Sequence, residues 1–98
     1  MLEYFTKNNL ISMDIFISNL SASFGEADLK ELFSEYGSIQ SVSIIRDRFT
    51  GESKCFGFVT MSDETEALEA ITRLNNQQIG YRKLEVSRAM PRTSYRLL

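Results

Sequence analysis

The sequence predicts an α+β fold of the ferredoxin-like type, with strands and helices in the order β-α-β-β-α-β. Three observations predict it: four short apolar segments have the pattern of strands, two segments have apolar residues at helical spacing, and turn residues separate them. The chain has 98 residues, which suffices for one hydrophobic core and not for two domains. Because crossover connections are right-handed, we expect a four-stranded antiparallel sheet with two helices on one face.

The first half of the pattern gives a strand, a helix and a second strand. Residues 14–19 contain the apolar run of the first strand. Apolar side chains then recur at i, i+3, i+4 and i+7, which predicts an amphipathic helix through Leu29, Leu32, Phe33 and Tyr36. Gly25 is expected as the N-cap of this helix and Gly37 as its C-terminal stop. A second strand follows from Ile39 to Ile44, where serines alternate with apolar residues.

The second half adds a loop, a third strand, a second helix and a last strand. A polar loop with a turn glycine, residues 47–52, leads into a strand over residues 56–61. Asp63 and Glu66 have the spacing of a capping box. The helix that they begin is predicted from the apolar residues Ala67, Ala70, Ile71 and Leu74. The last strand is expected at residues 84–87, where side chains alternate in polarity.

The same pattern divides the chain into three parts. Residues 1–13 show no clear period and are expected to form a poorly ordered N-terminal extension. Met13 directly precedes the first strand, so a domain that begins at this methionine is the alternative. Residues 14–89 form the predicted domain, and residues 90–98 form a basic C-terminal tail in which Pro91 ends the regular structure. Whether the chain is a fragment of a longer protein stays open.

Composition excludes several kinds of site. There is no histidine, so a histidine general base, a Ser-His-Asp triad and a conventional zinc site are all excluded. Cys55 is the only cysteine, so no disulfide can form within the chain. No apolar run is long enough to span a bilayer, and there is no signal-peptide pattern. We therefore expect no membrane partner and a cytosolic or nuclear location, of which we favour the cytoplasm.

The net charge of −2 argues against a nucleic-acid partner until its distribution is considered. Residues 21–36 and residues 62–75, which contain the predicted helices, each carry four acids and one basic residue. Residues 81–98 carry five basic residues and one acid. Because both helices are expected on one face of the sheet, the other face is predicted to be locally basic.

Two strand motifs carry the strongest functional signal. Residues 54–61 read KCFGFVTM and match the octamer K/R-G-F/Y-G/A-F-V-x-F/Y, with Cys55 in place of the glycine and Met61 in place of the last aromatic. Residues 15–20 read IFISNL and look like the hexamer that accompanies this octamer. Both motifs lie in the expected strands and in the expected order. Residues 14–89 therefore resemble the RNA-recognition-motif family, in particular its small single-domain bacterial members.

Side-chain alternation indicates where the motif residues point. With Ile15, Ile17 and Val59 turned toward the helices, the residues between them face the other way. The resemblance implies that the two motif strands are adjacent, which would gather three solvent-exposed rings: Phe16, Phe56 and Phe58. Such a patch suggests a binding site, and each base stacked on a ring is worth about 1–3 kcal/mol. Placing these rings in the core instead would empty the core of the aliphatic side chains.

Polar and basic residues would complete the site. Lys54 would reach a phosphate at the rim, as the motif match implies. Ser18 and Ser43 are expected to point outward. Glu85 would also point outward, where it either repels phosphate or accepts a hydrogen bond from a base amino group. Three arginines flank the predicted face, and each fits a plain surface role equally well: Arg46, Arg48 and Arg88.

The resemblance implies a single-stranded RNA-binding protein that is not an enzyme and needs no cofactor or metal, with single-stranded DNA as a weaker partner. One alternative is a protein-interaction module on the same fold. Such relatives typically lack the stacking aromatics and carry an Arg-x-Phe loop, whereas residues 80–84 read GYRKL. A hydrolase of the acylphosphatase type is a second alternative, but residues 20–24, LSASF, lack its phosphate-cradling loop. The RNA target and the oligomeric state stay open.

Overall fold

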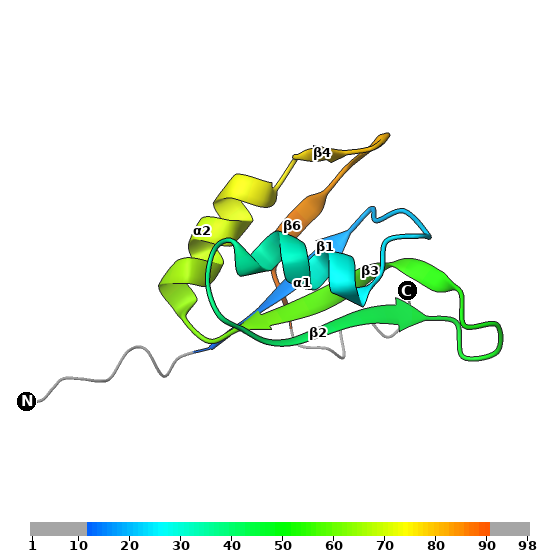
Figure 1. Cartoon of the computed structure of the whole chain (residues 1–98), viewed down its shortest axis with the longest axis horizontal. Helices are drawn as coiled ribbons and strands as arrows, with labels where there is room; N and C mark the ends of the chain where they lie inside the picture. Colours follow the sequence, from blue (N-terminus) through cyan, green and yellow to red (C-terminus); the bar gives the residue numbers. More distant parts are fainter. Residues whose placement is uncertain (1–11, 91–98) are drawn as a thin grey trace, which may run out of the picture.

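The structure, a computed structural model, describes residues 12–90 and contains a four-stranded antiparallel sheet in the order β2-β3-β1-β6 (Figure 1). Its strands are β1 (Met13–Ser18), β2 (Ile39–Arg46), β3 (Ser53–Met61) and β6 (Glu85–Arg88). The two motif strands, β1 and β3, are adjacent at the centre of the sheet. The predicted ferredoxin-like arrangement is confirmed, including the antiparallel pairing of every neighbouring pair of strands in this sheet.

Two helices cover one face of this sheet (Figure 1): α1 (Glu26–Ser34) contacts β2 and β3, and α2 (Glu64–Leu74) contacts β1, β3 and β6. Both helices begin where the sequence predicts. The backbone amide of Gly25, the N-cap of α1, donates a hydrogen bond of 2.8 Å to Oδ2 of Asp28. Oδ1 of Asp63 accepts from the backbone amides two and three residues later, at 2.8 and 3.1 Å. Asp63 thus satisfies two amides that the first turn of α2 leaves unpaired.

The hydrophobic core lies between the helices and the sheet. Strands and helices each contribute side chains that are 0% exposed: Ile15, Ile17, Leu29, Phe33, Val59, Met61, Ala67 and Ala70. Alternate residues of β1 and β3 and one stripe of each helix therefore meet in the same layer, which is what the two periodicities predict. Gly57 is required in β3 because a side chain there would collide with the backbone carbonyl of Ser43 on β2.

Several features differ from the predicted boundaries. α1 ends at Ser34, so Tyr36 lies beyond it, and β2 extends to Arg46. β1 begins at Met13, because this residue pairs with Met61 of β3 and its side chain is buried. β3 begins at Ser53, before the expected strand, because the pairing with β2 continues around an irregularity. A short hairpin, β4 (Gln78–Ile79) and β5 (Arg82–Lys83), precedes β6. The sequence did not predict this hairpin, since its strands have two residues each and are too short to show a period.

The predicted N-terminal extension and basic tail fall on residues 1–11 and 91–98 for the most part, and these lie outside the described residues. Within residues 12–90, neither helix is both long and apolar enough to cross a bilayer.

Candidate functional site

The face of the sheet turned away from the helices, the open face, carries matched side chains on β1 and β3. The register of the two strands makes three pairs on this face: Asp14–Thr60, Phe16–Phe58 and Ser18–Phe56. Their chain neighbours point through the sheet into the core, as side-chain alternation requires. The predicted orientation of both motif strands is thus the observed one.

Phe16, Phe56 and Phe58 form an aromatic cluster on the open face. The ring centre of Phe16 lies 5.6 Å from that of Phe56 and 5.5 Å from that of Phe58. The rings of Phe56 and Phe58 are 6.4 Å apart with an interplanar angle of 81°. Tilted and edge-to-face rings at these separations attract one another beyond simple burial, by about 0.5–1.5 kcal/mol per pair. The cluster is therefore a packed unit rather than three separate side chains.

The aromatic cluster is less exposed than the sequence predicts. Phe56 is 9% exposed and Phe58 is 3% exposed, while Phe16 is half-buried. The prediction of solvent-exposed rings is therefore wrong for Phe56 and Phe58. Neither ring belongs to the core between the helices and the sheet, so the prediction that both rings lie on the open face is confirmed. Rings in mutual contact cover part of one another's surface, and side-chain alternation alone does not report that contact.

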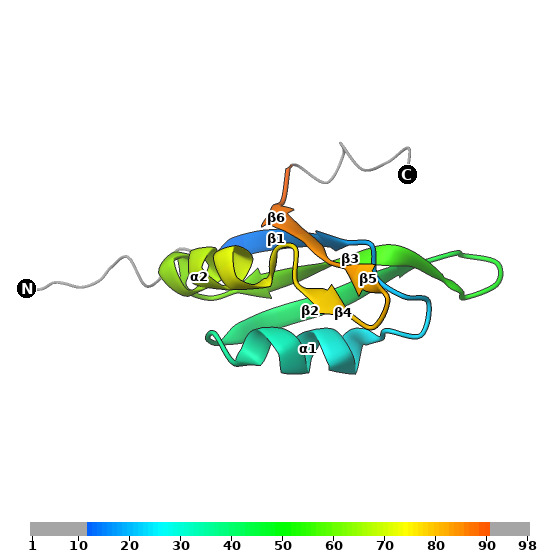
Figure 2. The same cartoon turned by 90° about the horizontal axis from the view of Figure 1, so that it is seen from above.

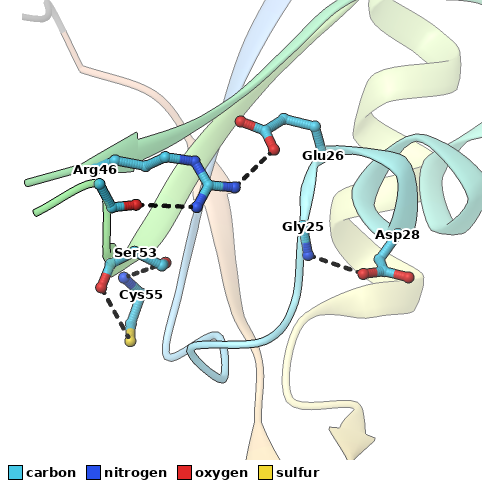
Figure 3. A network of polar contacts seen from close by, with 7 residues as sticks. Gly25, Glu26, Asp28, Arg46, Ser53 and Cys55 are labelled. Carbon is cyan, nitrogen blue, oxygen red and sulfur yellow. Dashed lines mark hydrogen bonds and ion pairs between the residues drawn. The ribbon is translucent and has the colours of Figure 1, made fainter.

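A bulge at Cys55 shapes the start of the octamer motif. The pairing of β2 with β3 shifts between Ile44 and Arg46, and Cys55 has a φ of 68°, in the left-handed region that glycine adopts without strain. Its amide donates to Oγ of Ser53 at 2.9 Å (Figure 3), and its carbonyl accepts from the amide of Leu20 at 3.0 Å. The backbone conformation at this position thus explains why the motif has a glycine there. Cys55, whose side chain is half-buried, adopts the same conformation with a strained backbone.

Polar side chains lie at both ends of the aromatic cluster. Oγ1 of Thr60 donates a hydrogen bond of 2.6 Å to Oδ1 of Asp14. At the other end, Oγ of Ser18 donates to Oε1 of Glu85 at 3.3 Å. Ser43 is half-buried on β2 and lies directly opposite a ring of the cluster. Both predicted serines are therefore beside the rings, and the predicted outward position of Glu85 is observed.

Two of the predicted basic residues bind acids of the helices instead of lining the aromatic cluster. A guanidinium nitrogen of Arg46 lies 2.8 Å from Oε1 of Glu26 in the first turn of α1 (Figure 3). This hydrogen bond, more than the charge attraction, lowers the pKa of Glu26 and raises the pKa of Arg46. A guanidinium nitrogen of Arg88 lies 2.7 Å from Oε2 of Glu64 at the start of α2. Both arginines occupy the helix-facing parity of their strands, so the structure does not place them beside the rings.

The loop between β2 and β3 extends beyond the end of the sheet (Figures 1 and 2) and carries Arg48, while Lys54 lies at the start of β3. The guanidinium of Arg48 lies 5.6 Å from the ring centre of Phe49, whose side chain is 88% exposed. Hydrogen bonds from the amides of Thr50 and Phe49, with a smaller contribution from the charge of Lys54, lower the pKa of Asp47. Lys54 itself is exposed. Sequence reasoning missed Phe49, although an aromatic residue in a polar loop was a usable signal.

A family model described as the RNA recognition motif matches residues 15–85 of this chain. The putative RNA-binding protein RbpA of Synechocystis is 41% identical over 80 residues, which cover 82% of this chain and 79% of that protein. A 31 kDa chloroplastic ribonucleoprotein of Nicotiana sylvestris is 39% identical over 82 residues, or 84% of this chain. The chain spans 26% of the length of that ribonucleoprotein.

Solved structures give the same result for the fold. The crystal structure of RNA binding protein PG1 has a TM-score of 0.78 at 43% identity and covers 81% of this chain and 95% of its own. A Sex-lethal protein/RNA complex has a TM-score of 0.73 at 34% identity, with 79% of this chain and 47% of that chain covered. Together with the family match, these likenesses support RNA binding and do not favour the protein-interaction alternative.

Proposed function

Because this chain belongs to the RNA recognition motif family, we propose that it binds single-stranded RNA on the open face of its sheet. The observation that carries the proposal is the aromatic cluster on β1 and β3, on the side that neither α1 nor α2 covers. Aromatic rings accept stacked bases of any sequence, because every base has a π-face. Relatives named as RNA-binding proteins, and the likeness to a protein/RNA complex, support the same role.

The rings do not offer equal access to a base. Phe16 is half-buried and exposes the most surface of the three, so we assign it the first stacked base. Stacking on Phe56 or Phe58, which are 9% and 3% exposed, requires neighbouring side chains to move. That rearrangement costs part of the stacking free energy. The hydroxyls of Ser18 and Ser43 lie beside the rings and can donate to or accept from base edges.

Phosphate binding is assigned to the exposed basic residues at the end of the sheet that holds the β2–β3 loop. Lys54 and Arg48 are exposed there, next to the start of the octamer motif. Arg46 lies at the same end and is held in an exposed ion pair, which contributes only about 0–1 kcal/mol, so phosphate can compete for it at small cost. The acids on the helices repel the RNA backbone from the opposite side of the domain.

The finer parts of the proposal concern specificity and setting. We assign binding without catalysis, with RNA preferred to DNA because the 2′-hydroxyl offers an additional donor and acceptor. Single strands are preferred because stacking on the rings requires bases that are not already paired.

A cytoplasmic location is also part of the proposal, and microscopy of the tagged protein in its own cells would test it.

Fluorescence anisotropy with short labelled nucleic acids of random sequence tests the proposal. Single-stranded RNA should bind more tightly than single-stranded DNA, and a perfectly paired RNA hairpin should bind least. Phe16→Ala should weaken binding of the single-stranded RNA by about 5- to 150-fold, equivalent to about 1–3 kcal/mol for one stacked base.

Leu68→Ala is the matched control, since Leu68 is an exposed apolar residue on α2, on the helical side of the domain. It should leave the affinity unchanged. If Phe16→Ala and Leu68→Ala have the same effect on RNA binding, the open face is not the binding surface. If none of the nucleic acids binds the wild-type chain, the proposed function is wrong.

A further inference from the structure

One end of the open face carries an acid–hydroxyl pair that base stacking does not use. Asp14 and Thr60 are cross-strand partners, and they follow directly on the Phe16–Phe58 pair along the same face. Oγ1 of Thr60 donates its proton to Oδ1 of Asp14 at 2.6 Å, which fixes the orientation of the carboxylate. The second carboxylate oxygen, Oδ2, has no hydrogen-bond donor among residues 12–90. An oriented carboxylate with a vacant acceptor therefore stands beside the rings.

A hollow opens next to this carboxylate. Its volume is about 420 Å³, and its lining consists of Ser12, Met13, Asp14, Arg88, Ala89 and Met90. This volume lies within the range of roughly 300–1,000 Å³ that is typical of sites for small organic groups. Two residues along a strand cover about 7 Å, so a base stacked on Phe16 or Phe58 can bring its edge to Asp14. The hollow gives space for a base at this end of the sheet.

We propose that Asp14 is a specificity-determining residue that accepts hydrogen bonds from the Watson–Crick edge of a guanine in the bound RNA. The inference rests on the proposed function, because it needs RNA to lie on the open face. Thr60 positions the carboxylate and the hollow beside Asp14 receives the base.

The chemistry of the four bases favours guanine at this position. An ionised carboxylate only accepts hydrogen bonds, and it offers two oxygens side by side. Guanine presents two adjacent donors, the N1 imino group and the N2 amino group, which match those oxygens. Adenine and cytosine each present one amino donor next to a ring-nitrogen acceptor, and uracil presents one imino donor between two carbonyl oxygens. Each of these three places at least one acceptor against the carboxylate.

The charge of Asp14 also makes a phosphate an unfavourable occupant. Arg88, the cation that lines the same hollow, has its guanidinium bound to Glu64 at 2.7 Å. Among residues 12–90 no cation is paired with the carboxylate of Asp14, and like charges repel. A neutral base with two donors can form hydrogen bonds with this carboxylate, whereas the negatively charged RNA backbone is repelled by it.

Anisotropy with three short single-stranded RNAs tests the assignment: oligocytidines of equal length that carry guanosine, inosine or adenosine at one central position, none of which can form a self-complementary duplex. Inosine lacks only the N2 amino group of guanosine. The wild-type chain should bind the guanosine RNA about 5- to 100-fold more tightly than the adenosine RNA, with the inosine RNA between them. Asp14→Asn should remove this preference while changing the affinity for the adenosine RNA by no more than about twofold.

Glu85→Gln is the matched control, because it removes one acid from the opposite end of the same face. It should retain the guanosine preference. If the wild-type chain binds all three RNAs equally, or if Asp14→Asn keeps the preference, the guanine assignment is overturned and the proposed function stands. If the wild-type chain binds none of the three RNAs, the proposed function fails and the assignment fails with it.

Discussion

The helix-covered face and the open face of the sheet contain neighbouring residues of the same strand, yet these residues have different partners. Val59 is 0% exposed and packs in the core that both helices share. Phe58, the preceding residue, is 3% exposed but packs against the rings of Phe16 and Phe56. Fractional exposure therefore does not separate the two faces, whereas the identity of the packing partners does. Alternate residues of one strand therefore serve different ends: those facing the helices stabilise the fold, and those on the open face are available for binding.

The largest effect is expected on the helix-covered face. Phe33 of α1 is 0% exposed and belongs to the core, so Phe33→Ala should lower the free energy of unfolding by about 3–5 kcal/mol. Urea denaturation measures this loss. The conservative change Phe33→Leu keeps the chain folded for binding assays, and it should bind RNA as the wild type does. A loss of affinity in the folded Phe33→Leu protein would show that the two faces are not independent.

On the open face we expect smaller effects, on both RNA affinity and stability. Phe58→Ala should weaken RNA binding by less than the roughly 1–3 kcal/mol expected for Phe16→Ala and should also lower the stability measurably, because its ring is packed against two others. Phe16→Ala should lower the stability less, since Phe16 is half-buried. Thermal unfolding and anisotropy of both variants check this ranking. Equal melting temperatures for the two variants would contradict the packing that the structure shows.

An increase in stability is expected at the bulge between the two faces. Cys55 adopts a φ of 68°, which costs a residue with a side chain about 1–2 kcal/mol and glycine almost nothing. Cys55→Gly should therefore raise the free energy of unfolding by about 1 kcal/mol, with part of the gain offset by the greater freedom of glycine in the unfolded chain. Cys55→Ala is the control and should not stabilise. If alanine stabilises as much as glycine, the backbone is not strained there.

The smallest expected effect is the pH dependence of the ion pair between β2 and α1. Arg46 lowers the pKa of Glu26 in the folded state, so this pair stabilises the fold at pH values above the ordinary glutamate pKa of 4.5. The contribution is lost as the pH falls through the lowered value. Glu26→Gln should lower the melting temperature slightly at pH 7 and not at all at strongly acidic pH. A difference that grows on acidification has the wrong sign for this account.

Most of the fold was predictable because each element has a period that points into one core. The helical spacing of apolar residues such as Leu29 and Phe33 predicted α1, and Asp63 predicted the start of α2. The alternation of side chains around Val59 predicted the orientation of β3. The β4–β5 hairpin was not predictable, since two-residue strands carry no period.

Less of the candidate site was predictable, because it depends on contacts between elements. The side of the sheet on which the rings lie follows from parity, but their burial follows from ring-to-ring packing across β1 and β3. Arg46 and Arg88 could be placed near the sheet from the sequence, whereas their pairing with Glu26 and Glu64 depends on where the helices begin in space. The local sequence pattern around each arginine does not indicate which acid it pairs with.

The central claim is that RNA binds the open face and not the helical face, and backbone amide chemical shifts during titration with single-stranded RNA test it most directly. The account predicts that the largest shift changes fall on β1 and β3, Met13–Ser18 and Ser53–Met61, with small changes over the exposed turns of α1 and α2. Changes concentrated in Glu26–Ser34 and Glu64–Leu74, with β1 and β3 unaffected, would contradict it.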